Sequence, residues 1–110
     1  MLYDAHGQWN QKFKLLANPD DSVTFENSGL VLDVANGAAK NGTQIQLWLK
    51  NGTIAQKFYL EPVGNDRFRI HSAIDQKFCI DVKGMKKDNG TKIQLYEKND
   101  SNAQLFTFVE

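Results

Sequence analysis

The sequence has few of the residues from which many structural and functional sites are built. Its one cysteine, Cys79, excludes an internal disulfide framework and a metal site made of several cysteines. Two prolines and eight glycines leave most turns to Asn, Asp and Ser. No hydrophobic run approaches the roughly 18 residues that a bilayer span requires, so we expect no membrane insertion.

Neither sign of charge dominates the 110 residues. Thirteen Lys and Arg side chains balance thirteen Asp and Glu, and the formal net charge at pH 7 is +0. This balance gives no overall field that would attract nucleic acid, so we expect no nucleic-acid partner. Hydrophobic residues make up 41% of the chain and aromatic residues 11%, which is enough for a core. We therefore expect one folded domain over residues 1–110.

Short stretches of alternating apolar and polar residues recur along the chain, and no stretch has the apolar spacing of an amphipathic helix. Turn residues separate these stretches, including four Asn-Gly pairs. Regularly spaced short strands with such turns indicate an all-β barrel or sandwich. The predicted strands are 12–16, 23–26, 30–34, 44–49, 57–61, 67–71, 78–82, 92–97 and 105–109.

The sequence contains an internal repeat. Displaced by 48 residues, segment 30–58 matches segment 78–106 without a gap, and 13 of the 29 paired residues are identical. A shorter match precedes these two, because Gln-Lys-Phe occurs at both 11–13 and 56–58. We expect the Phe that recurs in every repeat to lie in the core, at Phe13, Phe58 and Phe106. The three modules are placed at approximately 1–16, 17–61 and 62–110.

The second and third modules carry the same spaced motif. It consists of Asp-Val, a loop ending in Asn-Gly-Thr, then Ile-Gln-Leu-aromatic, and then Ala-Gln-x-Phe. A lone Gln-x-aromatic means little, because residues two apart simply share a strand face, but its repetition with the same Asp and Gln is specific. With these motifs the sequence resembles the ricin-type β-trefoil lectins. The matching segments are Leu32-Asp33-Val34, Gln46-Leu47-Trp48, Gln56-Lys57-Phe58, Ile80-Asp81-Val82, Gln94-Leu95-Tyr96 and Gln104-Leu105-Phe106.

The resemblance implies a β-trefoil of three four-stranded modules, each able to hold one shallow sugar pocket. Such a pocket has a physical basis: a sugar ring has an apolar face and a rim of hydroxyls, which suit an aromatic plate and directional hydrogen bonds. An ionised Asp accepts charge-assisted hydrogen bonds from the hydroxyls, and a neighbouring Gln amide can hold the Asp in place. The ligand-binding residues carried over are Asp33, Gln46, Trp48 and Gln56 in the second module, and Asp81, Gln94, Tyr96 and Gln104 in the third.

Both sets depart from the family's pattern at one position. Family sites carry an Asn before the final Gln, whereas this chain has Ala55 and Ala103 there. The change removes one sugar-facing amide from each site, a loss of roughly 0.5–1.5 kcal/mol. Asn51 and Asn99, in the loop after each aromatic residue, are the candidates to replace it.

Only half of a site is expected in the first module. Tyr3, Asn10 and Gln11 match the aromatic residue, the Asn and the Gln, but the partner Asp would lie before residue 1. Three modules need about 135 to 144 residues at this repeat length, so we expect the first half of the first module to be missing from these 110 residues. We expect the barrel to be open there, and the protein to form a homo-oligomer through this incomplete barrel edge.

Simpler interpretations exist for the same residues. Core packing would also explain Trp48 and Tyr96, and turn capping would explain Asp33 and Asp81. The two strand Gln residues would equally satisfy buried backbone groups. Cys79 aligns with a Val in a strand, which predicts a buried and inert thiol.

The sequence indicates binding rather than catalysis. No spacing links His6, His71 and Cys79 as an activated nucleophile, and neither a phosphate loop nor a zinc or calcium motif occurs, so we expect no cofactor and no metal. The prediction is a secreted or extracellular protein that binds glycans, with galactose-type sugars as the first choice and xylose or glucose polymers open. The alternative is a trefoil whose sugar sites have decayed and which is a structural or protein-interaction domain; Ala55 and Ala103 keep that alternative open.

Overall fold

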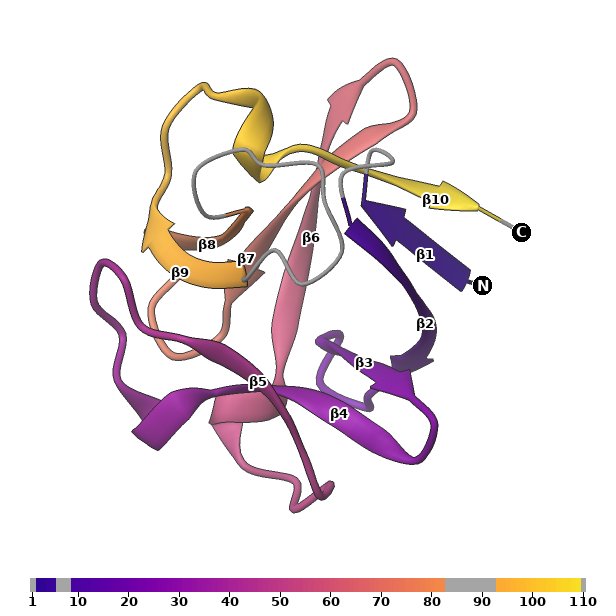
Figure 1. Cartoon of the computed structure of the whole chain (residues 1–110), viewed down its shortest axis with the longest axis vertical. Coiled ribbons are helices and arrows are strands. Elements are labelled where there is room, and N and C mark those ends of the chain that lie inside the picture. Colours follow the sequence, from indigo (N-terminus) through magenta and orange to yellow (C-terminus); the bar gives the residue numbers. More distant parts are fainter. Residues whose placement is uncertain (1, 6–8, 83–92, 110) are drawn as a thin grey trace.

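The computed structural model describes residues 2–5, 9–82 and 93–109, and the side chains of 13–82 and 93–107. All its strands belong to one sheet (Figure 1). The strands are β1 (Leu2–Ala5), β2 (Trp9–Ala17), β3 (Val23–Asn27), β4 (Leu30–Val34), β5 (Ile45–Trp48), β6 (Phe58–Gly64), β7 (Arg67–Ser72), β8 (Phe78–Val82), β9 (Ile93–Glu97) and β10 (Phe106–Val109). Three short 3₁₀ turns join some of them: η1 (Ala35–Gly37), η2 (Ile54–Gln56) and η4 (Asn102–Gln104).

The all-β prediction is confirmed, and each predicted strand is found. The bounds of β4 and β8 are those predicted, and the other ends shift by up to three residues. Short apolar or alternating segments separated by turn residues were sufficient to find these strands, including β8, which is buried at all five of its residues. The first strand, β1, was not predicted. No helix in the described parts of the chain is long and apolar enough to cross a membrane.

Six strands pair in a closed ring. β1 pairs with β2, β2 with β3, β3 with β6, β6 with β7, β7 with β10, and β10 returns to β1. Two hairpins stand beside the ring, β4 with β5 and β8 with β9. Each hairpin lies in the chain between two ring strands, so the ring positions the hairpins that carry the predicted site residues.

β1 closes the ring at the place where the sequence predicted an open edge. Tyr3 of β1 is opposite Phe13 of β2 on one side and Phe108 of β10 on the other (Figure 1). β1 thereby supplies hydrogen-bonding partners that two unpaired edges would lack. The expectation of an open barrel is therefore wrong for the described residues, and oligomerisation through that edge loses its basis. Tyr3 lies in the ring rather than on a hairpin like that of its counterpart Trp48.

Aromatic side chains from the ring strands form the centre of the core. Phe13, Phe58 and Phe106 are fully buried, as predicted from their recurrence in each module. Phe25 of β3 joins them: its ring centroid is 6.5 Å from that of Phe13 and 5.8 Å from that of Phe58. The hairpins contribute the apolar residues of their inward faces, namely Leu32, Val34, Ile45, Ile80, Val82, Ile93 and Leu95.

Candidate functional site

Asp33 is the acidic centre of the candidate site in the second module. It lies on β4, where the strand register pairs it with Gln46 of β5. The Gln46 amide Nε2 donates to Asp33 Oδ1 at 3.2 Å, and the Gln56 amide Nε2 donates to Asp33 Oδ2 at 2.9 Å. Two amides thus fix a carboxylate that is itself mostly buried. Each carboxylate oxygen keeps a lone pair for one further donor.

Gln56 lies behind the carboxylate and is only 2% exposed. Its Nε2 also donates to the backbone carbonyl of Leu49 at 2.9 Å, and its Oε1 accepts from the backbone N–H of Asn51 at 2.9 Å. The side chain therefore has its donors and its acceptor engaged within the protein. Gln56 positions Asp33 and the loop that follows Trp48, and its predicted contact with ligand stays a prediction.

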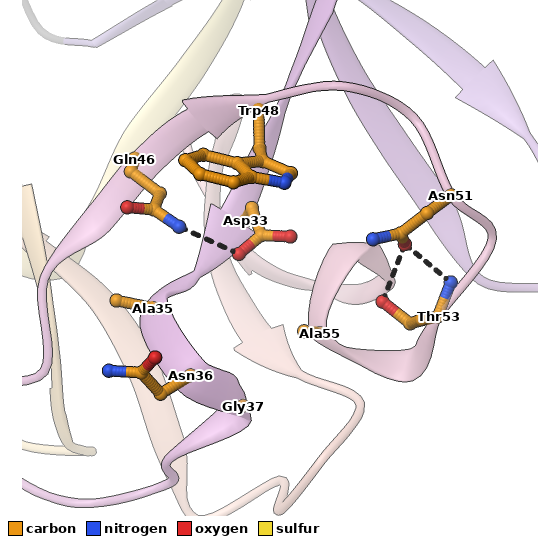
Figure 2. A pocket seen from close by; sticks show the side chains of 9 residues that line it. All are labelled: Asp33, Ala35, Asn36, Gly37, Gln46, Trp48, Asn51, Thr53 and Ala55. Carbon is orange, nitrogen blue, oxygen red and sulfur yellow. Dashed lines mark hydrogen bonds between the residues drawn. The ribbon is translucent and has the colours of Figure 1, made fainter.

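Trp48 forms an exposed aromatic surface beside this carboxylate. Residues two apart on a strand point to the same face, so Trp48 shares the face of Gln46, and it is 53% exposed. This exposure shows that Trp48 is not a core residue. Asp33, Gln46 and Trp48 line one open pocket of about 370 Å³ (Figure 2). A fixed carboxylate beside an aromatic face suits a ligand that has both hydroxyl groups and an apolar face.

The loop after Trp48 brings an amide to the same pocket. Asn51 Oδ1 accepts from the backbone N–H of Thr53 at 3.0 Å and from its hydroxyl at 2.7 Å. This turn leaves the amide nitrogen of Asn51 on the side on which Asp33 lies (Figure 2). Ala55 lines the pocket too, without a polar group to offer. Asn51 is therefore placed to donate where Ala55 cannot.

The third wall of the pocket was not predicted. It comes from η1 and consists of Ala35, Asn36 and Gly37. Asn36 and Gly37 have φ angles of 57° and 61°, a left-handed conformation that Asn and Gly adopt most readily. The Asn-Gly pair predicted a turn, but it did not predict that the turn would face Asp33. Asn36 adds a third side-chain amide to the pocket lining, after those of Gln46 and Asn51.

The third module repeats the same hydrogen-bonded arrangement. Gln94 Nε2 donates to Asp81 Oδ1 at 3.2 Å, and Gln104 Nε2 donates to Asp81 Oδ2 at 3.1 Å. Gln104 is fully buried and its Nε2 also donates to the Glu97 carbonyl, so Gln104 positions Asp81 as Gln56 positions Asp33. Tyr96 is 39% exposed. The residues equivalent to η1 lie outside the described part of the chain.

Asn99 lies in the loop of the third module as Asn51 lies in that of the second. Its backbone N–H donates to Gln104 Oε1 at 2.9 Å, and its Oδ1 accepts from the backbone N–H of Ser101 at 3.0 Å. The hairpin, the carboxylate, the buried Gln and the Asn turn thus recur together. Sequence identity between the modules therefore extends to their hydrogen bonds.

Comparison with known protein families agrees with this geometry. A family model described as "Ricin-type beta-trefoil lectin domain-like" matches residues 5–96. The chain belongs to this family. The closed ring with its hairpins is accordingly a β-trefoil. No curated protein sequence matches the chain.

Solved structures similar to this β-trefoil include a designed protein and two fungal proteins. A designed threefold-symmetric protein, ThreeFoil, has a TM-score of 0.85 and 20% identity, with 97% of this chain and 76% of that chain covered. The Rhizoctonia solani agglutinin has a TM-score of 0.79 and 24% identity over 98% and 74% of the two chains. The Macrolepiota procera ricin B-like lectin in complex with lactose has a TM-score of 0.73 and 19% identity over 94% and 73%. At these identities the likeness concerns the fold.

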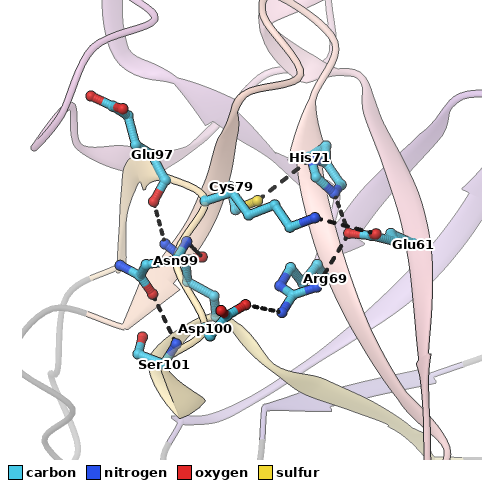
Figure 3. A network of polar contacts seen from close by, with 10 residues as sticks. Glu61, Arg69, His71, Cys79, Glu97, Asn99, Asp100 and Ser101 are labelled. Atoms are coloured by element: carbon cyan, nitrogen blue, oxygen red, sulfur yellow. Dashed lines mark hydrogen bonds and ion pairs between the residues drawn. The ribbon is translucent and has the colours of Figure 1, made fainter.

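A charged network ties the loop of the third module to the ring of this β-trefoil (Figure 3). Arg69 of β7 pairs with Asp100 at 3.2 Å, and Glu61 of β6 pairs with Lys98 at 3.5 Å. Asp100 and Lys98 flank Asn99, so both pairs hold the segment that carries this candidate residue. In the second module the position of Asp100 is occupied by a glycine, so that ion pair has no counterpart there.

His71 joins the network through Glu61, which also contacts Arg69 and Lys98. Its Nε2 is 2.8 Å from Glu61 Oε1, and its Nδ1 is 2.6 Å from the backbone carbonyl of Gln76. Both contacts are with acceptors, so only the doubly protonated ring donates to both. The hydrogen bond from His71 is the main reason that the pKa of Glu61 lies below its usual value. Burial raises the pKa of the neighbouring Cys79 thiol to about 11, in agreement with its predicted inertness.

The half-site of the first module is not described. The side chains of Tyr3, Asn10 and Gln11 lie outside the described residues, and only their backbone positions in β1 and β2 are known. Among the described residues, no group of three His, Cys, Asp or Glu side chains is arranged to hold a metal ion. The two complete candidate sites are therefore those of the second and third modules.

Proposed function

We propose that this β-trefoil is a non-catalytic carbohydrate-binding domain with galactose-type sugars as its ligands. The family to which it belongs supports carbohydrate binding in general. The observation that carries the proposal is the open pocket in which a carboxylate, fixed by two amides, lies beside an exposed Trp48 ring. The choice of galactose rests on the family resemblance, and lactose is the ligand of one of the similar structures.

Each pocket residue has a role in this proposal. The Trp48 ring stacks on the apolar face of a sugar, while Asp33 accepts hydrogen bonds from two neighbouring hydroxyls. Gln46 holds the carboxylate, and Asn51 and Asn36 donate to further hydroxyls at the rim. In the third module, Asp81, Tyr96 and Asn99 take the corresponding roles.

The pocket lining supports binding rather than hydrolysis. Asp33 is the one carboxylate among its described lining residues, and glycosidases that act through carboxylates need two. A shallow pocket of this kind fits a millimolar affinity, about 4 kcal/mol, with stronger attachment to surfaces that present many sugars. Such surfaces are found outside cells, so we propose a secreted or extracellular location.

The test measures the binding of galactose, of lactose and of xylose and glucose oligomers, by NMR and on a glycan array. The variants are Asp33→Asn and Asp81→Asn, which keep the shape of the side chain and remove its charge. Asp66→Asn, in an exposed turn, is the matched control. We expect that sugar added to each single variant no longer changes the chemical shifts of residues in the altered module. We expect the double variant to show no binding on the array.

A second function is favoured by one observation. Ala55 and Ala103 leave both sites without the Asn of the family pattern, which fits a trefoil that has lost sugar binding and is a structural or protein-interaction domain. If the wild-type protein binds none of the sugars and behaves on the array as the double variant does, this alternative replaces the proposal.

A further inference from the structure

The loop that carries Asn99 is tied to the ring on both sides of this residue (Figure 3). Arg69 of β7 is a fixed anchor, because its side chain is only 12% exposed, and its Nη2 lies 3.2 Å from Asp100 Oδ1. Glu61 of β6 lies 3.5 Å from Arg69 Nη1 and, through its other oxygen, 3.5 Å from Lys98 Nζ. Charges of alternating sign thus connect the two residues that flank Asn99 to the ring.

The second module has an equivalent loop without these ion pairs. At the positions of the opposed Glu61 and Arg69, it has two uncharged residues that are likewise opposed. These are Leu16 and Thr24. Gly52 stands where the third module has its exposed carboxylate, and within the described parts of the chain no ion pair reaches residues 49–53. The two loops share their internal hydrogen bonds and differ in their ties to the ring.

The ion pair of Asp100 bears on the orientation of the Asn99 side chain. Asn99 Oδ1 accepts from the backbone N–H of Ser101 at 3.0 Å, and the Asn99 N–H donates to Gln104 Oε1 at 2.9 Å. Asp100 lies between Asn99 and Ser101 in the chain, so an anchor on Asp100 restrains the turn that they form. A loop that is held in its binding conformation before the ligand arrives loses less conformational freedom on binding.

We propose that Arg69 is a positioning residue for the third-module site, acting through Asp100, and that sugar binding by this module weakens with salt whereas binding by the second does not. The inference rests on the proposed function, because it concerns the affinity of the same site. A galactose-type sugar carries no charge, so salt screens its contacts with the protein very little. Salt does screen the ion pairs of exposed groups, and the Asp100 side chain is 96% exposed. A salt-dependent affinity therefore reports the anchor of the loop.

The first measurement is the affinity of each module for lactose, by NMR titration at salt concentrations from about 0.01 M to 1 M. The chemical shifts of the two loops report the two modules separately. Asp100→Asn removes the charge, Asp100→Glu keeps it, and Arg69→Met removes the anchor. Asp66→Asn, which also removes one carboxylate from an exposed position, is the matched control.

The second measurement is amide hydrogen exchange of the sugar-free protein, which follows the loops themselves. The N–H groups of Asn99 and Asn51 donate to equivalent buried glutamines, both at 2.9 Å, so they are matched probes of the two loops. We expect exchange at Asn99 to become faster in high salt and in Asp100→Asn, while the rate at Asn51 does not change. If neither module binds lactose, the proposed function fails, and exchange at Asn99 alone decides the role of Arg69.

We expect the dissociation constant of the third module to rise about two- to fivefold in Asp100→Asn and in high salt, and that of the second module to stay the same. Asp100→Glu should restore most of the affinity, and Asp100→Asn should have no further effect when combined with Arg69→Met. Salt-independent affinity and exchange in the third module overturn the proposal, as does an equal response of both modules. A loss in Asp100→Asn that persists in the Arg69→Met background shows direct contact of Asp100 with sugar and overturns it too. If Arg69→Met fails to fold, the Asp100 variants and the salt profile decide.

Discussion

Replacing Gln56 by Leu is predicted to destabilise the protein strongly. The two side chains have similar volumes, so the core around Gln56 keeps its packing while the amide is lost. The change removes three hydrogen bonds, to Asp33 Oδ2, to the Leu49 carbonyl and from the Asn51 N–H. Neutral hydrogen bonds contribute about 1 kcal/mol each and one to a carboxylate about 1.5–3 kcal/mol, so we expect a loss of about 3–5 kcal/mol.

The assay is urea-induced unfolding followed by circular dichroism and by Trp fluorescence. Gln46→Leu is the comparison, because Gln46 is only partly buried and makes one hydrogen bond of 3.2 Å to the same carboxylate. That variant loses one bond instead of three, so its loss should be about 1.5 kcal/mol, the lower end of the range for a bond to a carboxylate. If Gln56→Leu is no less stable than Gln46→Leu, the buried amide does not hold the loop and the carboxylate, and the role given to it is wrong.

Three further predictions test other parts of the molecule. Trp48→Ala should abolish ligand binding by the second module and change the unfolding free energy by less than about 1 kcal/mol, because the side chain is exposed; a variant that unfolds places Trp48 in the core. Because the pKa of Glu61 is lowered in the folded state, its ion pairs stabilise the protein above the ordinary carboxyl pKa and are lost as pH falls through the folded value. Glu61→Gln should therefore be less stable than wild type by up to about 1 kcal/mol near pH 7, and this difference should shrink as pH falls below the ordinary carboxyl pKa; a difference that does not shrink in acid contradicts this. Cys79 should resist alkylation in the native protein and react after unfolding, and rapid labelling of the folded protein would refute its burial.

Local patterns explain what the sequence could predict. β4 and β8 were found with correct bounds because each combines an apolar run with a turn residue on either side. The contact between Asp33 and Gln46 agrees with what the family resemblance implied, and it recurs because a hairpin of the same loop length brings the same residues opposite each other in both modules. Such features depend on residues that are close together in the sequence, which is why a single sequence was sufficient to predict them.

The features that were missed depend on contacts between residues that are distant in the sequence, or on the direction in which a turn points. β1 joins the ring because β2 and β10 both need a partner, and neither need is visible in residues 2–5. Gln56 turns inward because it ends a 3₁₀ turn, and its place in the repeated motif did not predict this burial. Asn36 reaches the pocket through a left-handed backbone conformation that the Asn-Gly pair permits but does not direct.

The barrel can close only after β1 and β10 have paired. Leu2 is opposite Val109, so the contact that closes the ring joins residues separated by nearly the whole chain. During synthesis on the ribosome, β1 emerges before β10 and has one unpaired edge until β10 follows. Proteolysis that removes β10 would expose the same edge again. Incomplete folding and proteolysis thus both produce a protein with an open barrel. We expect the protein to aggregate in this state.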